Sequence, residues 1–345
     1  MKIIVDAMGG DNAPLAPVEG ALQAAKDLGV EIVLAGDEAE LRGALGRQGH
    51  VELPRGVTIL PTTQVIEMED NPARAFREKP DSSMTRCLEA VRDGAADAMV
   101  SAGSTGALLS GATLVVKRIR GIRRAAFAPV LPNARGKMVL IDAGATAECT
   151  PEYLLQYAFM GSYYAKRFLG IDQPRVALLN IGAEPSKGMD LQRQAHALLT
   201  KAHEEGRIRF IGNLEAREAL SPGDADVLVS DGFTGNIFLK TMEGMALTFS
   251  QMLKSMILSG TKTKFAGMLL KDGIRDLKKQ FDSAEVGGTA LLGISKPVIK
   301  AHGSSDGRAF FSAIRQAAEV ADSGINEDIA ANVEHMRLPK GEPEA

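Results

Sequence analysis

"IIVDAMGGDNAPLAPVEGALQAAKDLG" (residues 3–29) joins a short apolar run, a loop with two carboxylates and two glycines, and an amphipathic segment. The segment after the loop has one apolar face at helical spacing, and Gly29 can close the helix. The stretch therefore predicts a strand, a loop and a helix, which is an arrangement that often binds phosphate. It contains neither G-x-G-x-x-G nor G-K-[ST], so it is not a nucleotide loop of either common kind.

The same unit recurs along the chain. Short apolar runs, each ending in a small polar or acidic residue and followed by glycine and a helical pattern, occupy residues 2–6, 96–101, 137–142, 175–180 and 225–230. Continuous apolar strands of this kind are typical of a parallel sheet buried on both faces, and alternation with helices indicates an α/β fold. Thr150 and Pro151 mark the start of one such helix, and Gly170 marks its end. We predict a Rossmann-like, doubly wound, mostly parallel sheet.

Composition excludes some classes of function. The 345 residues carry a formal net charge of −3, which gives no general attraction to nucleic acid. The two cysteines, Cys87 and Cys149, and the five histidines lack metal-type spacing, so we expect no metal, no cofactor and no disulfide framework. The chain reaches Asp6 after a few apolar residues, which indicates no signal peptide and a cytoplasmic protein. Residues 98–116 carry no charge and are just long enough to cross a membrane, but their Ser, Thr and Gly content favours a buried strand, loop and helix.

Unusual residues gather in the loops that follow the predicted strands, at 6–11, 101–106, 142–146, 180–188 and 230–236. Ligands of open parallel sheets bind outside the carboxyl ends of the strands. Glycine lets the backbone approach a ligand, and free N–H groups at a helix start favour an anion. The loops therefore predict an anion site, the alternative being that their Ser, Thr and Asp residues only cap helices.

Charged groups in these loops need separate interpretations. Asp6, Asp11 and Asp231 could orient cations, accept a proton or brace the loops, and we favour bracing for Asp142. Lys187 lies in "NIGAEPSKGMD" (180–190) and could bind phosphate. His302 lies in "KAHGSSDG" (300–307), where a histidine can exchange protons near neutral pH.

Several motifs together resemble the PlsX family of phosphate acyltransferases. They are "DAMGGD" (6–11), "SAGSTGAL" (101–108), "NIG" with "SKG" (180–188), "SDGFTGN" (230–236) and "GGTALLGISKPVIKAHGSS" (287–305). The resemblance runs in order from residue 1 to about 335. Ser104 stands where the family pattern has Asn, and Ala143 and Thr146 also depart from it.

The resemblance implies an activity and an architecture. Inorganic phosphate attacks the thioester of a long-chain acyl-ACP, giving acyl-phosphate for phospholipid synthesis and free acyl carrier protein. It also implies a phosphotransacetylase/isocitrate dehydrogenase-like unit, here residues 1–338, with a central cleft between two lobes. Phosphate is already largely a dianion at neutral pH, so the enzyme mainly has to orient it, which can be worth roughly 7–11 kcal/mol.

Site roles follow as hypotheses. We expect catalytic roles for His302, Lys187, Asp231 and Asn236, with His302 serving the departing thiolate. We expect substrate or phosphate contacts at Asp6, Gly9, Gly10, Asp11, Ser101, Gly103, Ser104, Thr105, Gly106, Gly232, Gly235 and Ser304. Neither cysteine lies in a loop of this kind, so we predict direct transfer without an acyl-enzyme.

Residues 247–281 differ from the rest, because Met and Leu stripes at helical spacing alternate with an excess of lysine. This pattern predicts a protruding amphipathic hairpin, about 240–283, with a turn near 259–263. A basic amphipathic segment can lie on an anionic membrane or dock acidic acyl carrier protein, and the alternative is packing in a core or dimer. Contact residues would be Leu258, Lys262, Lys264, Phe265, Met268, Leu269 and Lys271. The family resemblance implies a homodimer associated peripherally with the inner face of the membrane, where the next acyltransferase is a further expected partner. We predict that residues 339–345 form a disordered tail.

Alternatives remain open. One is a short-chain phosphate acyltransferase that uses acyl-CoA, and another is a nicotinamide-dependent dehydrogenase, which the missing dinucleotide fingerprint disfavours. A third is a non-catalytic, membrane-associated organiser of lipid synthesis. The basic residues lack interleaved aromatic platforms, so we expect no nucleic-acid partner.

Overall fold

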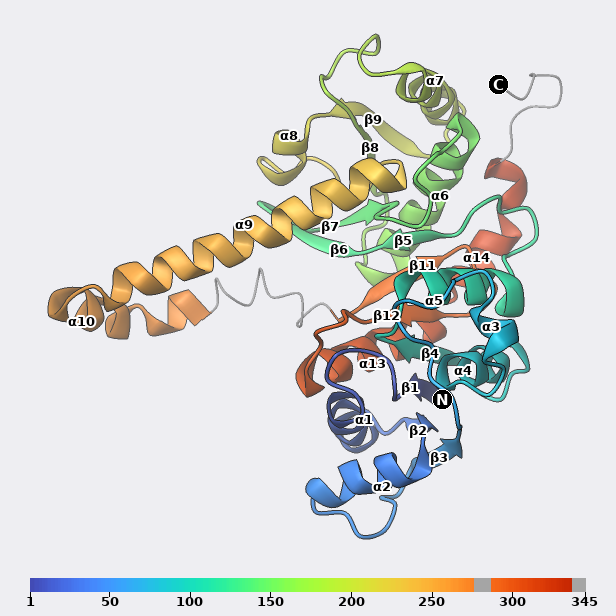
Figure 1. The fold of residues 1–345 in the computed structure, drawn as a ribbon. Helices are drawn as coiled ribbons and strands as arrows, with labels where there is room; N and C mark the ends of the chain where they lie inside the picture. The colour runs from blue at the N-terminus through green and yellow to red at the C-terminus, as the bar shows by residue number, and fades with distance from the viewer. Residues whose placement is uncertain (276–286, 337–345) are drawn as a thin grey trace.

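The computed structural model describes residues 1–275 and 287–336. The end of the expected hairpin, within residues 276–286, and the predicted tail at 339–345 lie outside the described residues. Figure 1 shows two α/β lobes, one above the other, and a long helical projection that extends from the upper lobe.

Each lobe is built around its own sheet. The first lobe has a seven-stranded sheet in the order β3-β2-β1-β4-β12-β11-β5, and the second has a five-stranded sheet in the order β6-β7-β10-β8-β9. The strands of the first sheet are β1 (Lys2–Asp6), β2 (Glu31–Gly36), β3 (Val57–Pro61), β4 (Ala98–Ser101), β5 (Ala126–Ala128), β11 (Thr289–Leu292) and β12 (Val298–Lys300). Those of the second are β6 (Val130–Asn133), β7 (Gly136–Ile141), β8 (Arg175–Leu179), β9 (Arg209–Leu214) and β10 (Val227–Val229).

The five strands predicted from apolar runs are confirmed as β1, β4, β7, β8 and β10. Most neighbouring strands pair in parallel, as predicted, whereas β11 pairs antiparallel with β5 and β12, and β6 with β7. The chain passes from one sheet to the other directly between β5 and β6. Five similar apolar runs do not indicate this division, because the pairing partners of each run are set by tertiary packing.

Both faces of the first sheet are buried. Ile3 and Val5 of β1 belong to one hydrophobic cluster, while Ile4 between them belongs to another. Helices α1 (Leu15–Asp27) and α13 (Gly307–Asp322) pack together on the first face, and α4 (Ser83–Arg92) covers the second. This explains why the strand sequence is apolar throughout rather than alternating.

The other helices of the two lobes lie between strands in the chain or follow the last strand. They are α2 (Glu38–Arg47), α3 (Ala75–Glu78), α5 (Thr105–Gly111), a π-helical turn (Ala112–Val116), α6 (Pro151–Phe168), α7 (Asp190–Glu204), α8 (Ala216–Leu220) and α14 (Ile325–Ala331), followed by a 3-10 turn (Val333–Met336). Thr150 caps α6, where its hydroxyl accepts a hydrogen bond from the N–H of Tyr153. Residues 98–116 form β4, α5 and the π-helical turn, as the sequence favoured. Within the described residues, no helix has the length and apolarity needed to cross a membrane.

The projection consists of α9 (Gly232–Leu258) and α10 (Thr261–Leu269), which pack against each other (Figure 1). The sequence placed the first helical stripe near residue 247, but α9 begins at Gly232, in the "SDGFTGN" loop itself. Its 27 residues span about 40 Å. Only Gly232, Gly235 and Phe238 are buried along it. One continuous helix therefore joins a candidate site loop to an exposed apolar surface.

Candidate functional site

Three strand ends meet at the carboxyl edge of the first sheet. Asp6 of β1 is in register with Ser101 of β4, and Ser101 is in register with Lys300 of β12. All three strands run parallel, so the loops 6–11, 101–106 and 300–307 leave the sheet side by side. Of the five predicted ligand loops, 6–11 and 101–106 therefore lie at this edge, whereas 142–146, 180–188 and 230–236 follow strands of the second sheet.

Asp6 is the buried centre of this cluster. Its two carboxylate oxygens accept hydrogen bonds from the hydroxyls of Ser83 and Ser101, each at 2.6 Å. Burial raises the pKa of Asp6, and the two serine hydrogen bonds oppose that rise. Asp6 therefore braces β1, β4 and α4, which was one of the three roles considered for it.

Close packing accounts for several glycines in the loops. A Cβ on Gly9 would lie 2.7 Å from Asp6 Oδ2 and 2.7 Å from the backbone nitrogen of Gly103. Gly103 donates its N–H to Ser101 Oγ at 3.1 Å. Gly10 has φ +100°, a conformation that favours glycine. The Ser101 hydroxyl and the Gly103 N–H, both expected to hold phosphate, thus have protein partners.

The loop after β12 is tied to the first loop. Asp11 donates its N–H to the Gly303 carbonyl at 2.8 Å, and Asn12 Nδ2 donates to the carbonyls of Ser304 and Ser305. Asp11, His302 and Ser304 are exposed at this junction. The sequence motifs "DAMGGD" and "KAHGSS" therefore form one surface.

His302 has a defined ring orientation. Its Nδ1 lies 2.9 Å from Ser304 Oγ and accepts the N–H of Ser304 at 3.3 Å. Because Nδ1 accepts that hydrogen bond, the neutral ring carries its proton on Nε2. His302 can consequently donate a hydrogen bond from Nε2.

Lys300 is a candidate that sequence reasoning missed. Its Nζ donates to the carbonyls of Ala102, at 3.3 Å, and Ala301. Burial is the largest cause that lowers its pKa, to about 8; the charge of Lys240 lowers it further, while Asp6 and Asp11 raise it. The available signal was a cation at the end of an otherwise apolar run, directly before "AHG".

The second lobe supplies another group of loops, after β7, β8 and β10. Asp231 caps α9: its Oδ1 accepts the N–H of Thr234 and its Oδ2 accepts the Thr234 hydroxyl, both at 2.8 Å. Gly232 donates its N–H to the Thr146 carbonyl, and Gly235 donates to the Asp231 carbonyl. Asp231 was expected to be catalytic, and Gly232 and Gly235 were expected to contact phosphate; in the structure these groups have capping and packing partners.

Asp142 is fully buried and braces the second group of loops, as the sequence favoured. Its carboxylate accepts hydrogen bonds from the backbone N–H groups of Phe127, Gly144, Ala145 and Thr146, at 2.7–3.1 Å. Phe127 belongs to β5 of the first sheet, whereas Asp142 directly follows β7 of the second. A single carboxylate thus links the two sheets.

The titration of Asp142 gives a testable pH dependence. Burial raises the pKa of Asp142 from 3.8 to about 6, against the lowering effect of its hydrogen bonds. The folded chain therefore holds the proton of Asp142 more tightly than the unfolded chain does. The contribution of this proton to the free energy of unfolding is complete below pH 4 and is lost as pH rises through 6. The free energy of unfolding of the wild type, relative to Asp142→Asn, is expected to fall by up to about 3 kcal/mol over that range. Urea denaturation at pH 4, 5, 6 and 7 measures this difference, and a constant difference would contradict it.

The remaining predicted residues are dispersed. Ser104 caps α5, and Thr105 and Gly106 are exposed on its first turn. Asn236 is exposed on α9 beside Gly144. Lys187 lies in an exposed loop after β8, and no contact in the described part of the chain joins its ammonium group to His302.

Both cysteines are closer to the candidate loops than the sequence indicated. Cys87 is buried within the electrostatic influence of Asp6, and Cys149 Sγ donates to the Thr146 carbonyl at 3.3 Å. Burial raises the pKa of the Cys87 thiol strongly and that of Cys149 to about 12. Both thiols are therefore protonated at neutral pH, which makes them poor nucleophiles.

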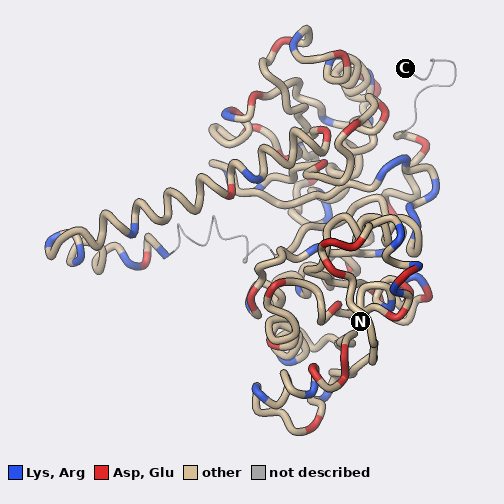
Figure 2. The backbone as a smooth tube through the Cα atoms, in the orientation of Figure 1, with Lys and Arg blue, Asp and Glu red and all other residues tan. Residues whose placement is uncertain are grey.

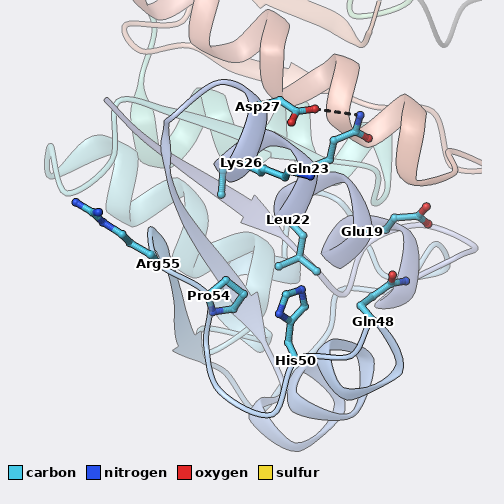
Figure 3. A pocket seen from close by; sticks show the side chains of 10 residues that line it. Glu19, Leu22, Gln23, Lys26, Asp27, Gln48, His50, Pro54 and Arg55 are labelled. Atoms are coloured by element: carbon cyan, nitrogen blue, oxygen red, sulfur yellow. Dashed lines mark hydrogen bonds between the residues drawn. The ribbon is translucent and has the colours of Figure 1, made fainter.

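A hollow of about 620 Å³ lies elsewhere, between the last turns of α1 and the loop after α2. Figure 3 shows Leu22 and His50 pointing into it from these two segments. Helix α1 begins beside the carboxyl edge of the sheet and runs back from it, so this hollow is separate from the candidate site. In residues 1–275 and 287–336, no group of three His, Cys, Asp or Glu side chains could hold a metal ion.

The projection presents both apolar and basic side chains. Phe265, Met268 and Leu269 are each more than half exposed on α10. Lysines dominate the charge at its outer end (Figure 2). The seven residues predicted to contact a membrane or a carrier protein all lie in this outer region, from Leu258 to Lys271.

Comparison with known proteins adds a family and a fold. A family model described as "Fatty acid synthesis protein" matches residues 1–328. A phosphate acyltransferase of Lysinibacillus sphaericus is 46% identical over 340 residues, covering 98% of this chain and 100% of the relative. A phosphate acyltransferase of Geobacillus thermodenitrificans is 47% identical over 336 residues, covering 97% of this chain and 99% of the relative.

Solved structures give the fold. A phosphotransacetylase from Streptococcus pyogenes aligns with TM-score 0.63 and 20% identity, over 93% of this chain and 94% of that one. A branched-chain phosphotransacylase from Enterococcus faecalis aligns with TM-score 0.55 and 16% identity, over 94% of this chain and 99% of that one. These likenesses show a shared Rossmann-type α/β architecture.

Proposed function

The chain belongs to the PlsX family of phosphate acyltransferases, and from this premise we propose that it transfers long-chain acyl groups from acyl-ACP to inorganic phosphate. The products are acyl-phosphate, which feeds phospholipid synthesis, and free acyl carrier protein. The observation that supports this reaction best is the shared surface formed by the loops after β1, β4 and β12. It combines His302, which can donate a hydrogen bond from Nε2, with a nearby cation, Lys300.

The proposed reaction is a direct displacement. A phosphate oxygen forms a bond to the thioester carbon, the carbonyl becomes an oxyanion, and the carbon–sulfur bond then breaks. His302 donates a hydrogen bond from Nε2–H to the departing thiolate, which takes up the proton that hydrogen phosphate releases. The protonated state of Cys87 and Cys149 supports a route without an acyl-cysteine intermediate.

Among the other predicted residues, exposure separates two groups. Asp11, Thr105, Gly106, Asn236 and Ser304 are exposed at the loops and remain candidates for substrate contact. Asp6, Ser101, Gly103, Asp231, Gly232 and Gly235 maintain the shape of the loops through their hydrogen bonds and close packing. Lys187 remains a predicted phosphate contact.

We propose that the projection formed by α9 and α10 is a docking surface for a carrier protein or a membrane. Its lysines suit an acidic carrier protein or an anionic membrane surface, and its exposed Met, Leu and Phe side chains suit a bilayer or the same helix of a second copy. Because α9 begins at the site and ends in the projection, a docked partner would deliver its acyl group toward the loop that starts α9. We therefore propose a homodimer associated peripherally with the membrane, close to the acyltransferase that consumes acyl-phosphate.

Purified protein incubated with palmitoyl-ACP tests the reaction. Release of free carrier protein should require inorganic phosphate and should yield a product that hydroxylamine traps. Release only from acetyl- or butyryl-CoA would replace the proposal with a short-chain acyl-CoA activity. If neither donor releases its carrier, in a folded sample that binds anionic liposomes, the result would favour a non-catalytic, membrane-associated organiser of lipid synthesis.

His302→Ala is expected to lower phosphate-dependent release by roughly tenfold at pH 7. This lies below the range that general acids usually supply, because a thiolate already leaves readily. His50→Ala is the matched control, since His50 is an exposed histidine in the separate hollow. Equal rates for the two variants would contradict the role of His302.

A further inference from the structure

Lys300 carries a positive charge that the protein leaves without a close counterion. Its side chain is mostly buried at the end of β12. An ammonium group has three N–H donors, and two of them reach the carbonyls of Ala102 and Ala301. In the described part of the chain, no carboxylate lies within 4 Å of its Nζ, so the third donor has no protein acceptor.

No close ion pair offsets the charge of Lys300. The carboxylates of Asp6 and Asp11 raise its pKa from a distance, but in the described part of the chain neither lies within 4 Å of its Nζ. Lys240 on α9 lowers its pKa, although the ammonium group of Lys240 is itself paired with Glu243 at 2.7 Å. A mostly buried ammonium group with an unused N–H donor is costly unless an acceptor joins it.

We propose that Lys300 binds the attacking inorganic phosphate directly. This inference rests on the proposed function and names the residue that holds its second substrate. The assignment follows from strand register, which places Lys300 beside Ser101 and only two residues before His302. The cation that binds phosphate and the hydrogen-bond donor to the leaving thiolate are then two residues apart in the chain. A fixed cation at this position also offsets the repulsion between phosphate and the developing oxyanion.

The proposal has a pH signature. The charged groups that influence Lys300 are Asp6, Asp11 and Lys240, and Lys240 is paired with Glu243. Burial lowers the pKa of Lys300 to about 8, so its charge and its hold on phosphate decline as pH rises above that value. Lys300→Arg keeps the charge to much higher pH, so its phosphate affinity should not share that decline.

The proposal is tested by titrating inorganic phosphate, without any acyl donor, into the wild type, Lys300→Met and Lys300→Arg, which measures the phosphate affinity of each. Lys300→Met is expected to weaken phosphate binding at least tenfold at pH 7, as the loss of a charge-assisted hydrogen bond predicts. Lys296→Met is the control, because Lys296 is an exposed lysine at the opposite end of the same strand. Thermal unfolding shows whether each variant is folded. The phosphate affinity of the wild type, measured between pH 7 and 9, tests the role of Lys300 without any substitution.

Steady-state kinetics with palmitoyl-ACP then separates the two substrates. The KM for phosphate should rise in Lys300→Met while the KM for palmitoyl-ACP changes little. Unchanged phosphate binding, or an effect confined to the KM for palmitoyl-ACP, would overturn the proposal. A wild type that binds phosphate through Lys300 yet releases no carrier protein would contradict the proposed function and leave this inference standing.

Discussion

Asp142→Ala is expected to lower the free energy of unfolding by about 3–5 kcal/mol at pH 7. The substitution leaves four backbone N–H groups without their acceptor, in a site where the carboxylate is fully buried. One of the four belongs to Phe127 in the first sheet and the others to the loop after β7 in the second. The variant therefore loosens the connection between the lobes as well as the loop itself.

Asp37→Ala is the matched control for this prediction. Asp37 caps α2 and accepts one N–H, from Glu40 at 3.0 Å, in an exposed position. Its loss should cost about 1 kcal/mol. Urea denaturation of both variants measures the difference, and similar losses for the two would show that the N–H groups around Asp142 find other acceptors.

Strand positions and the sites of ligand loops could be predicted from the sequence. Runs such as "KIIVD" are apolar without alternation because both faces of the sheet are covered, as the separate clusters of Ile3 and Ile4 show. Parallel strands then bring their carboxyl-end loops to one edge, which places Asp6, Ser101 and His302 near one another. These inferences depend only on local pattern and on a general property of parallel sheets.

The importance of Lys300 could not be read from local pattern. Its neighbours in the sheet are set by register with β4 and, through β4, with β1, whose sequences lie about 200 and 300 residues away. The burial that shifts its pKa and the carbonyls that accept its N–H groups appear only when these strands pair. A lysine at the end of an apolar run otherwise resembles an ordinary strand terminus.

The glycines of "SDGFTGN" show a second limit of sequence reasoning. Gly-rich loops predict room for an anion, but here Gly232 and Gly235 allow α9 to contact the loop after β7. Both interpretations use the same property of glycine, its lack of a side chain. Only the position of the neighbouring backbone distinguishes a ligand site from close packing.

Gly235→Ala follows from that close packing and should have the largest effect on activity. A Cβ at this position would lie 1.9 Å from the Asp142 carbonyl oxygen, which is backbone and has little freedom to retreat. The first turn of α9 must therefore shift away, and it carries Asp231, Asn236 and Lys240 with it. We expect a loss of about 3 kcal/mol in stability and of about 100-fold in phosphate-dependent acyl transfer, since a displacement near 1 Å can cost that much.

Gly244→Ala, on the same helix, separates the effect of contact from that of helix composition. Among the described residues, no atom outside the helix lies within 4 Å of a Cβ at Gly244, so alanine there should stabilise α9 by about 0.5–1 kcal/mol and leave transfer unchanged. Denaturation and carrier-protein release, measured for both variants, test the pair. If Gly235→Ala retained full transfer activity, the first turn of α9 could not be part of the site. Loss of activity in Gly235→Ala alone would instead tie the start of the projection to the chemistry at the strand ends.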